Sequence, residues 1–254
     1  MVCSIRFFKF GLDRKDALYT GSLVIRILFQ PIEESARVYF SKLLASTDTK
    51  EVEAEKKDTL LGAANLLATL CHAHLLLGLF LIAICPNYVQ PILSAILGQK
   101  WVSTSAPAVL RAYCYFIPLL GLNGITEAFV QAVANEDEVA SMSKWMLIWS
   151  AVYVAACFVL AGLTSQKEVG LIQANMVNMV CRIAWAGVFI YRWFGARDGS
   201  GKMKAVWTSI IPPNSVLLVF GLAAAVIRLS ASRMNVMEHF GLGIACAMVC
   251  ASTM

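Results

Sequence analysis

The chain has 254 residues, of which 59% are hydrophobic and 15% are charged, and its formal net charge is +5. An ordinary soluble domain has about 25% charged residues, so this composition excludes a soluble enzyme. Together with the mean hydropathy of +0.69, it predicts a protein that crosses a lipid bilayer several times. The modest, scattered positive charge gives no sign of a nucleic-acid partner.

About seven candidate spans follow from continuous apolar runs, because a transmembrane helix needs about 20 mostly apolar residues. They cover residues 18–43, 60–85, 108–133, 145–166, 169–192, 205–227 and 236–254. These runs predict an all-α fold, a polytopic transmembrane helix bundle surrounded by membrane lipids. The bundle is expected over residues 17–254, and residues 1–16 remain an unassigned N-terminal tail.

Prolines modify two of these spans. Proline lacks a backbone N–H and interrupts or bends a helix. Pro31 is therefore expected to kink the first span. Pro86 and Pro91 are expected to end the second span near residue 85 and to leave a short or interfacial helix over residues 90–98.

The first span carries a stripe of polar residues. Its members are Arg26, Gln30, Glu33, Glu34 and Arg37. At about 100° per residue they share one third of the helix circumference, and their four charges sum to zero. Glu33 and Arg37 are four residues apart, which is a spacing that allows an ion pair.

Two further spans carry polar stripes of the same kind. The span over residues 108–133 contains Arg111, Asn123, Glu127 and Gln131, and the last three recur every four residues on one face. The span over residues 169–192 contains Asn175, Asn178 and Arg182, which fall within about 60° of one another.

Ionisable side chains cost about 2.5–3.5 kcal/mol each in the middle of a membrane, and they therefore face a protein interior or a watery cavity. Three polar stripes on three helices favour one shared hydrated interior, a translocation cavity lined by these twelve candidate substrate-binding residues. The alternative is structural: the same residues form ion pairs and interhelical hydrogen bonds that hold the bundle together.

Catalytic, metal and cofactor sites have little support. His72 and His74 are two residues apart and lie on opposite helix faces, so they cannot share a metal ion. The stretch Gly195–Lys202 has Ala196 where a phosphate-binding loop needs glycine and Met203 where it needs serine or threonine. The sequence therefore predicts no cofactor, no metal and no catalytic residue.

Three segments resemble the Rft family, the oligosaccharide translocation proteins of endoplasmic reticulum membranes. They are Gly21–Lys42, Leu110–Glu136 and Ala174–Ile183, and they occur in the family's order. The second is the most specific, with a Tyr-Cys, a Pro-Leu-Leu and an Asn-Gly-x-x-Glu-Ala-Phe pattern in succession.

The resemblance implies a multi-pass protein of the endoplasmic reticulum membrane that resembles the second lobe of a flippase-superfamily transporter. Its implied task is the translocation of the dolichyl-diphosphate-linked Man5GlcNAc2 oligosaccharide for protein N-glycosylation. The arginines would then contact the diphosphate, the carboxylates would pair with them, and the amides would bind sugar hydroxyls. The family topology places residues 47–58, 134–144 and 192–205 in the cytosol.

The similarity covers only the C-terminal half of a family member, so a closed cavity would need a partner lobe or a homodimer. A second interpretation is a non-transporting membrane subunit that supports N-glycosylation through interactions. An exporter of small solutes is a third interpretation. A membrane-embedded glycosyltransferase lacks its expected carboxylate motif.

Overall fold

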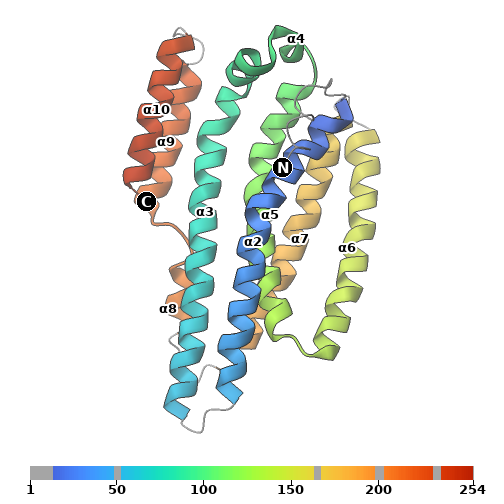
Figure 1. Cartoon of the computed structure of the whole chain (residues 1–254), viewed down its shortest axis with the longest axis vertical. Coiled ribbons are helices and arrows are strands. Elements are labelled where there is room, and N and C mark those ends of the chain that lie inside the picture. Colours follow the sequence, from blue (N-terminus) through green and yellow to red (C-terminus); the bar gives the residue numbers. More distant parts are fainter. Residues whose placement is uncertain (1–13, 49–52, 163–166, 198–202, 231–235, 254) are drawn as a thin grey trace, which may run out of the picture.

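The computed structural model describes residues 14–48, 53–162, 167–197, 203–230 and 236–253, and every regular element within these ranges is a helix (Figure 1). The helices are α2 (Arg14–Asp48), α3 (Glu53–Leu97), α4 (Gln99–Val102), α5 (Ala106–Val133), α6 (Glu136–Gly162), α7 (Lys167–Gly195), α8 (Met203–Thr208), α9 (Asn214–Ser230) and α10 (Val236–Ser252). The predicted tail over residues 1–16 lies mostly outside the described residues.

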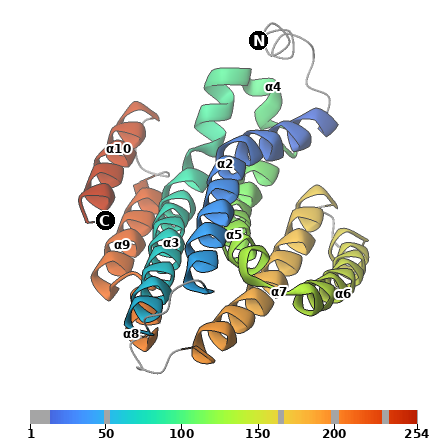
Figure 2. The same cartoon turned by 60° about the horizontal axis from the view of Figure 1, so that its bottom comes forward.

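The predicted all-α polytopic bundle is confirmed. Within the described ranges, α3, α5, α6 and α7 are long and apolar enough to cross a membrane. The apolar helices α9 and α10 have 17 residues each. Helix α2 has 35 residues and includes the charged stripe predicted over residues 18–43. It continues through Pro31 and bends along its length (Figure 2), as a proline inside a helix favours.

The prediction that Pro86 and Pro91 end the second span is wrong. Helix α3 has 45 residues and contains both prolines. Each proline removes only one helical hydrogen bond, and the residues around them are buried: Tyr88 is 5% exposed and Leu93 is 6% exposed. Packing of this segment against neighbouring helices therefore maintains the helix where local preference alone would break it.

The prediction of one continuous span over residues 205–227 is also wrong. The six-residue α8 and the 17-residue α9 are separate helices. Between them, Pro212 and Pro213 provide no backbone donor, and a residue before proline avoids the helical region. The His72 Nδ1 atom of α3 lies 3.0 Å from the carbonyl oxygen of Ile210 in this break. A side chain thus binds a carbonyl group that the interrupted helix leaves without its usual partner.

Helix α5 lies in the middle of the bundle and packs against α2, α3 and α7, whereas α6 packs mainly on α7, and α9 and α10 pack on α3 (Figures 1 and 2). An aromatic core joins three of these helices near one end. The ring centre of Phe129 on α5 lies 5.1 Å from that of Phe40 on α2 and 5.2 Å from that of Phe194 on α7. All three phenylalanines are fully buried.

Chain direction alternates along the bundle. The C-terminal ends of α2 and α5 meet the N-terminal ends of α3 and α6 at its lower end in Figure 1, where α7 also ends. This is the arrangement expected if the connections after α2, α5 and α7 lie on one side of a membrane.

Candidate functional site

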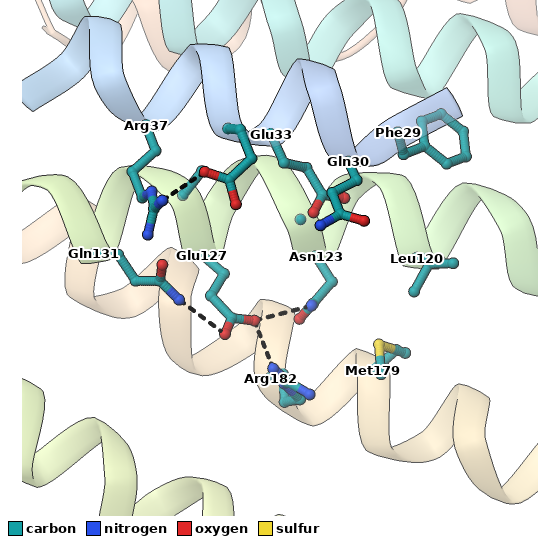
Figure 3. Close-up of a pocket in the computed structure, with 13 residues that line it drawn as sticks. Phe29, Gln30, Glu33, Arg37, Leu120, Asn123, Glu127, Gln131, Met179 and Arg182 are labelled. Atoms are coloured by element: carbon teal, nitrogen blue, oxygen red, sulfur yellow. Dashed lines mark hydrogen bonds and ion pairs between the residues drawn. The ribbon is translucent and has the colours of Figure 1, made fainter. Parts of the chain in front are cut away.

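A polar cavity of about 390 Å³ lies between α2, α5 and α7 (Figure 3). Its lining consists of Phe29, Gln30, Glu33, Glu34, Arg37, Leu120, Asn123, Gly124, Glu127, Ala128, Gln131, Met179 and Arg182. Eight of the twelve predicted site residues are therefore brought together by the fold. The cavity combines three carboxylates, two guanidinium groups and three amide side chains within a bundle whose other side chains are mostly apolar.

Glu127 is the centre of a hydrogen-bond network in this cavity. Its Oε2 atom lies 2.6 Å from Nη2 of Arg182 and accepts a hydrogen bond of 3.1 Å from Nδ2 of Asn123. Its Oε1 atom accepts a hydrogen bond of 3.3 Å from Nε2 of Gln131. The four-residue spacing on α5 places both amides one turn from the carboxylate, and Arg182 reaches it from α7. Because the bonds involve an ionised acceptor, they are stronger than neutral ones.

Arg182 retains a donor that this network does not use. Its Nε atom is buried and has no hydrogen-bond partner within the described ranges. Buried donors are nearly always paired with protein or ordered water. A guanidinium group that is bound to Glu127 through one edge therefore offers a further N–H group to a ligand or to water.

On the α2 side, the spacing predicts Glu33 as the partner of Arg37, and the structure pairs Arg37 with Glu34. The Nη2 atom of Arg37 lies 2.5 Å from Oε2 of Glu34. The Glu33 carboxyl group instead lies directly over Gly124 of α5, where a Cβ atom would overlap it. The absence of a side chain at Gly124 thus lets a carboxylate from α2 lie against the backbone of α5.

Four predicted residues are not placed in the cavity. Arg26 belongs to α2, but its side chain lies outside the described residues. Arg111 lies near the N-terminal end of α5, where its Nε atom donates a hydrogen bond of 3.2 Å to the carbonyl oxygen of Pro86. Asn175 and Asn178 are half-buried on α7 and are absent from the cavity lining.

The α7 residues differ because of their position on the helix. Met179 contributes to the lining, and its neighbour Asn178 points about 100° away from it. Asn175 lies about 10 Å from Arg182 along the helix axis. Sequence reasoning did not identify the apolar lining residues Phe29, Leu120 and Met179, since apolar side chains in an apolar span carry no signal of a cavity.

Within the described part of the chain, no group of three histidine, cysteine, aspartate or glutamate side chains is close enough to hold a metal ion. What the cavity offers is hydrogen bonding and charge within a membrane-spanning bundle. It is suited to binding a polar ligand.

Comparison with known proteins gives a consistent family. A family model described as Rft protein matches residues 17–254. The chain is 34% identical over 207 residues to the Man(5)GlcNAc(2)-PP-dolichol translocation protein RFT1 of Kluyveromyces lactis, covering 82% of this chain and 36% of that protein. Proteins of the same name are 35% identical in Saccharomyces cerevisiae (68% of this chain, 29% of that protein) and in Mus musculus (68% and 31%).

The chain spans about a third of the length of these curated relatives. No solved structure matches it. The family model covers all residues that line the polar cavity. The chain therefore belongs to the Rft protein family.

Proposed function

We propose that this chain takes part in moving Man(5)GlcNAc(2)-PP-dolichol across the endoplasmic reticulum membrane, for protein N-glycosylation. The observation that carries the proposal is the polar cavity between three helices of an otherwise apolar bundle. The printed names of the relatives supply the substrate. Residues that line an intramembrane cavity and carry charge are typical of translocation paths.

The chemistry of the cavity suits the charged part of this lipid. A diphosphate needs cationic hydrogen-bond donors, and guanidinium groups bind phosphate oxygens through two N–H groups at once. Arg37 and Arg182 provide such groups from α2 and α7, on two sides of one cavity. Each is held by a carboxylate, Glu34 and Glu127 respectively, so each is oriented before a ligand arrives.

The amides suit the sugars. Gln30, Asn123 and Gln131 line the same cavity, and amide side chains both donate to and accept from hydroxyl groups. A pocket of roughly 300–1,000 Å³ holds a drug-sized ligand, whereas a diphosphate with seven sugars is larger. The cavity would therefore hold the diphosphate and the adjacent sugars, and the outer sugars would lie beyond it.

The exposure of α2 supports a second lobe or a second copy of the chain around this cavity. The side chains of Arg37 and Glu34 are 43% and 53% exposed, and Arg37 lies about 9 Å inside the end of the span predicted over residues 18–43. Contact with lipid there would be costly for both charges. A partner that encloses a hydrated space against α2 would remove this cost.

The test uses yeast cells in which the native RFT1 protein is repressed and a chimera replaces it. In this chimera the present chain substitutes for the matching segment of the Saccharomyces cerevisiae relative. We expect the chimera to restore N-glycosylation of a secreted reporter, scored by gel mobility. Arg182→Gln should lower the restored fraction several-fold, and Arg182→Lys, which keeps the charge, should retain more of it. Arg228→Gln changes an exposed arginine on α9 and serves as the matched control.

Protein levels measured by immunoblot separate loss of function from loss of the protein. Restoration by Arg182→Gln equal to that of the control would contradict a role of the cavity in the pathway. A second measurement addresses transport itself: vesicles that contain the purified chimera should accelerate movement of the labelled lipid between leaflets. Full rescue in cells without accelerated movement in vesicles would identify a supporting membrane subunit instead and would refute the proposal.

A further inference from the structure

A second groove, separate from the polar cavity, opens between α6 and α7 and has a volume of about 800 Å³. Tryptophans from both helices line it. On α6, Trp145 and Trp149 are stacked, with ring centres 5.4 Å apart and planes at 22°. On α7, Trp185 is stacked on Phe189 at 5.8 Å. Tryptophan is enriched where a membrane meets water, so these rings place this part of the groove near a membrane surface.

Two arginines lie where the groove reaches the C-terminal end of α7. The guanidinium carbon of Arg197 is 4.0 Å from the ring centre of Trp193, and Nη1 of Arg197 donates a hydrogen bond of 3.1 Å to the Trp193 carbonyl oxygen. The side chain of Arg192 is exposed and has no hydrogen bond or ion pair with the described part of the chain. Two guanidinium groups beside aromatic rings at a membrane surface form a suitable site for a phosphate group.

The same end of the groove also carries negative charge. Glu138 of α6 lines it, and Oε2 of Glu138 accepts a hydrogen bond of 2.9 Å from the backbone N–H of Asn135. An ammonium group would find a carboxylate and tryptophan faces here, both of which attract cations. A headgroup that carries both a phosphate and an ammonium therefore fits this mixture better than a purely anionic one.

The length of the groove suits an acyl chain. From Val180 to Arg197 it follows α7 for about 25 Å, at 1.5 Å per residue. One leaflet of hydrocarbon is about 15 Å thick, half of a core of about 30 Å, which leaves room for a headgroup. The wall is open to lipid: Val180 and Val188 are 51% and 50% exposed, and no residue of the most apolar stretch of α6 is buried.

We propose that the groove between α6 and α7 binds a zwitterionic glycerophospholipid, with its phosphate at Arg192 and Arg197, its ammonium at Glu138 and an acyl chain along Val180 and Val188. This site is independent of the polar cavity and of the proposed transport of lipid-linked oligosaccharide. It assigns the chain a bound membrane lipid at the end of the bundle where α7 ends.

The test uses the full chain in dioleoylphosphatidylcholine vesicles that contain a few per cent of phosphatidylcholine with a photoactivatable acyl chain. Cross-linked peptides are identified by mass spectrometry. We expect peptides of α7 around Val180 and Val188 to be labelled several-fold more than the exposed face of α10. The double variant Arg192→Gln and Arg197→Gln should lower this groove labelling about five-fold and leave the labelling of α10 unchanged, which also reports that the bundle is folded. Arg228→Gln should change neither.

Equal labelling of all lipid-exposed helices would overturn the proposal, because it would indicate only the ordinary lipid coat. So would undiminished labelling in the double variant. Preferential labelling by a phosphatidylglycerol analogue would contradict the zwitterionic assignment. Loss of groove labelling in the chimera with the Saccharomyces cerevisiae relative would identify the groove as a contact with another lobe, which refutes lipid binding there.

Discussion

The ion pair between Glu127 and Arg182 allows a quantitative test of the structure. We consider Glu127→Gln, Arg182→Gln and the variant that combines them. Removing one partner of a buried ion pair costs about 3–5 kcal/mol, because the other charge stays in a poorly solvated site. The side chains of Glu127 and Arg182 are 18% and 26% exposed. Because this burial is incomplete, we expect the lower end of the range, about 3 kcal/mol, for each single variant.

The double variant should lose less free energy of unfolding than the two single variants lose together. With both charges removed, two amides face each other and no uncompensated charge remains in the cavity. We expect a coupling energy of about 2 kcal/mol, which corresponds to about thirty-fold in the unfolding equilibrium. Each single variant should lower the melting temperature by roughly 6–12 °C, at about 2–4 °C per kcal/mol.

The cysteines of the chain provide the assay. Cys71 and Cys250 are 4% and 0% exposed, so a thiol-reactive dye reaches them only when the bundle opens. Heating the purified chain in detergent with this dye gives a melting temperature for each variant, and Arg228→Gln is the surface control. Losses that simply add in the double variant would show that Glu127 and Arg182 do not stabilise each other, and the network in Figure 3 would then be wrong.

The same thermal assay tests two other contacts. His72→Ala should destabilise the chain by about 1–3 kcal/mol, because the carbonyl group of Ile210 loses its side-chain partner; an unchanged melting temperature would mean that water replaces the imidazole without loss. Gly243→Ala should cost about 1–3 kcal/mol, since the new Cβ atom overlaps the Tyr88 ring. Gly221→Ala adds the same methyl group to open space on α9 and should stabilise the chain by about 0.5–1 kcal/mol, because alanine is favoured over glycine inside a helix; equal effects of the two alanines would rule out the close approach of α10 to α3.

Much of the polar cavity could be predicted from periodicity alone. Asn123, Glu127 and Gln131 recur every four residues, and a helix turns such a repeat into one face whatever surrounds it. The cost of charge in hydrocarbon explains why that face lines a polar cavity, in which Asn123 is buried and Gln131 is exposed. The sequence therefore indicated which α5 residues share a surface, and the fold supplied Arg182 as their partner.

Other positions depend on packing that a single helix does not encode. Asn175 and Arg182 share a stripe on α7, but only Arg182 is close enough along the axis to reach Glu127. Arg111 is polar and intramembrane like the cavity residues, and it binds the backbone of α3 instead. Helical periodicity gives the direction in which a side chain points from its helix. Whether the side chain belongs to a site also depends on its position along the helix axis and on which helix packs opposite it.

The prolines show the same limit. Pro86 and Pro91 are five residues apart, about 1.4 helical turns, and buried neighbours keep α3 helical around each of them. Pro212 and Pro213 are adjacent, so two successive donors are missing and the helix ends. The local sequence predicted a helix end at Pro86 and Pro91, where the helix continues, and a continuous span across Pro212 and Pro213, where the helix is interrupted. The effect of a proline therefore depends on the contacts around it.

The interruption between α8 and α9 has a mechanical consequence. Helices α9 and α10 form a pair that is attached to the remaining bundle mainly through α3. Residues 209–213 lie between α8 and α9, so rotation of the pair about them would leave both of these helices intact. It would, however, have to break the packing of α9 and α10 on α3, including the hydrogen bond of 2.9 Å from the Tyr88 hydroxyl to the His239 carbonyl oxygen. A similar rotation in the middle of α5 or α7 would break the backbone hydrogen bonds of a continuous helix. The prolines thus leave a break in the chain directly before a pair of helices that does not line the polar cavity.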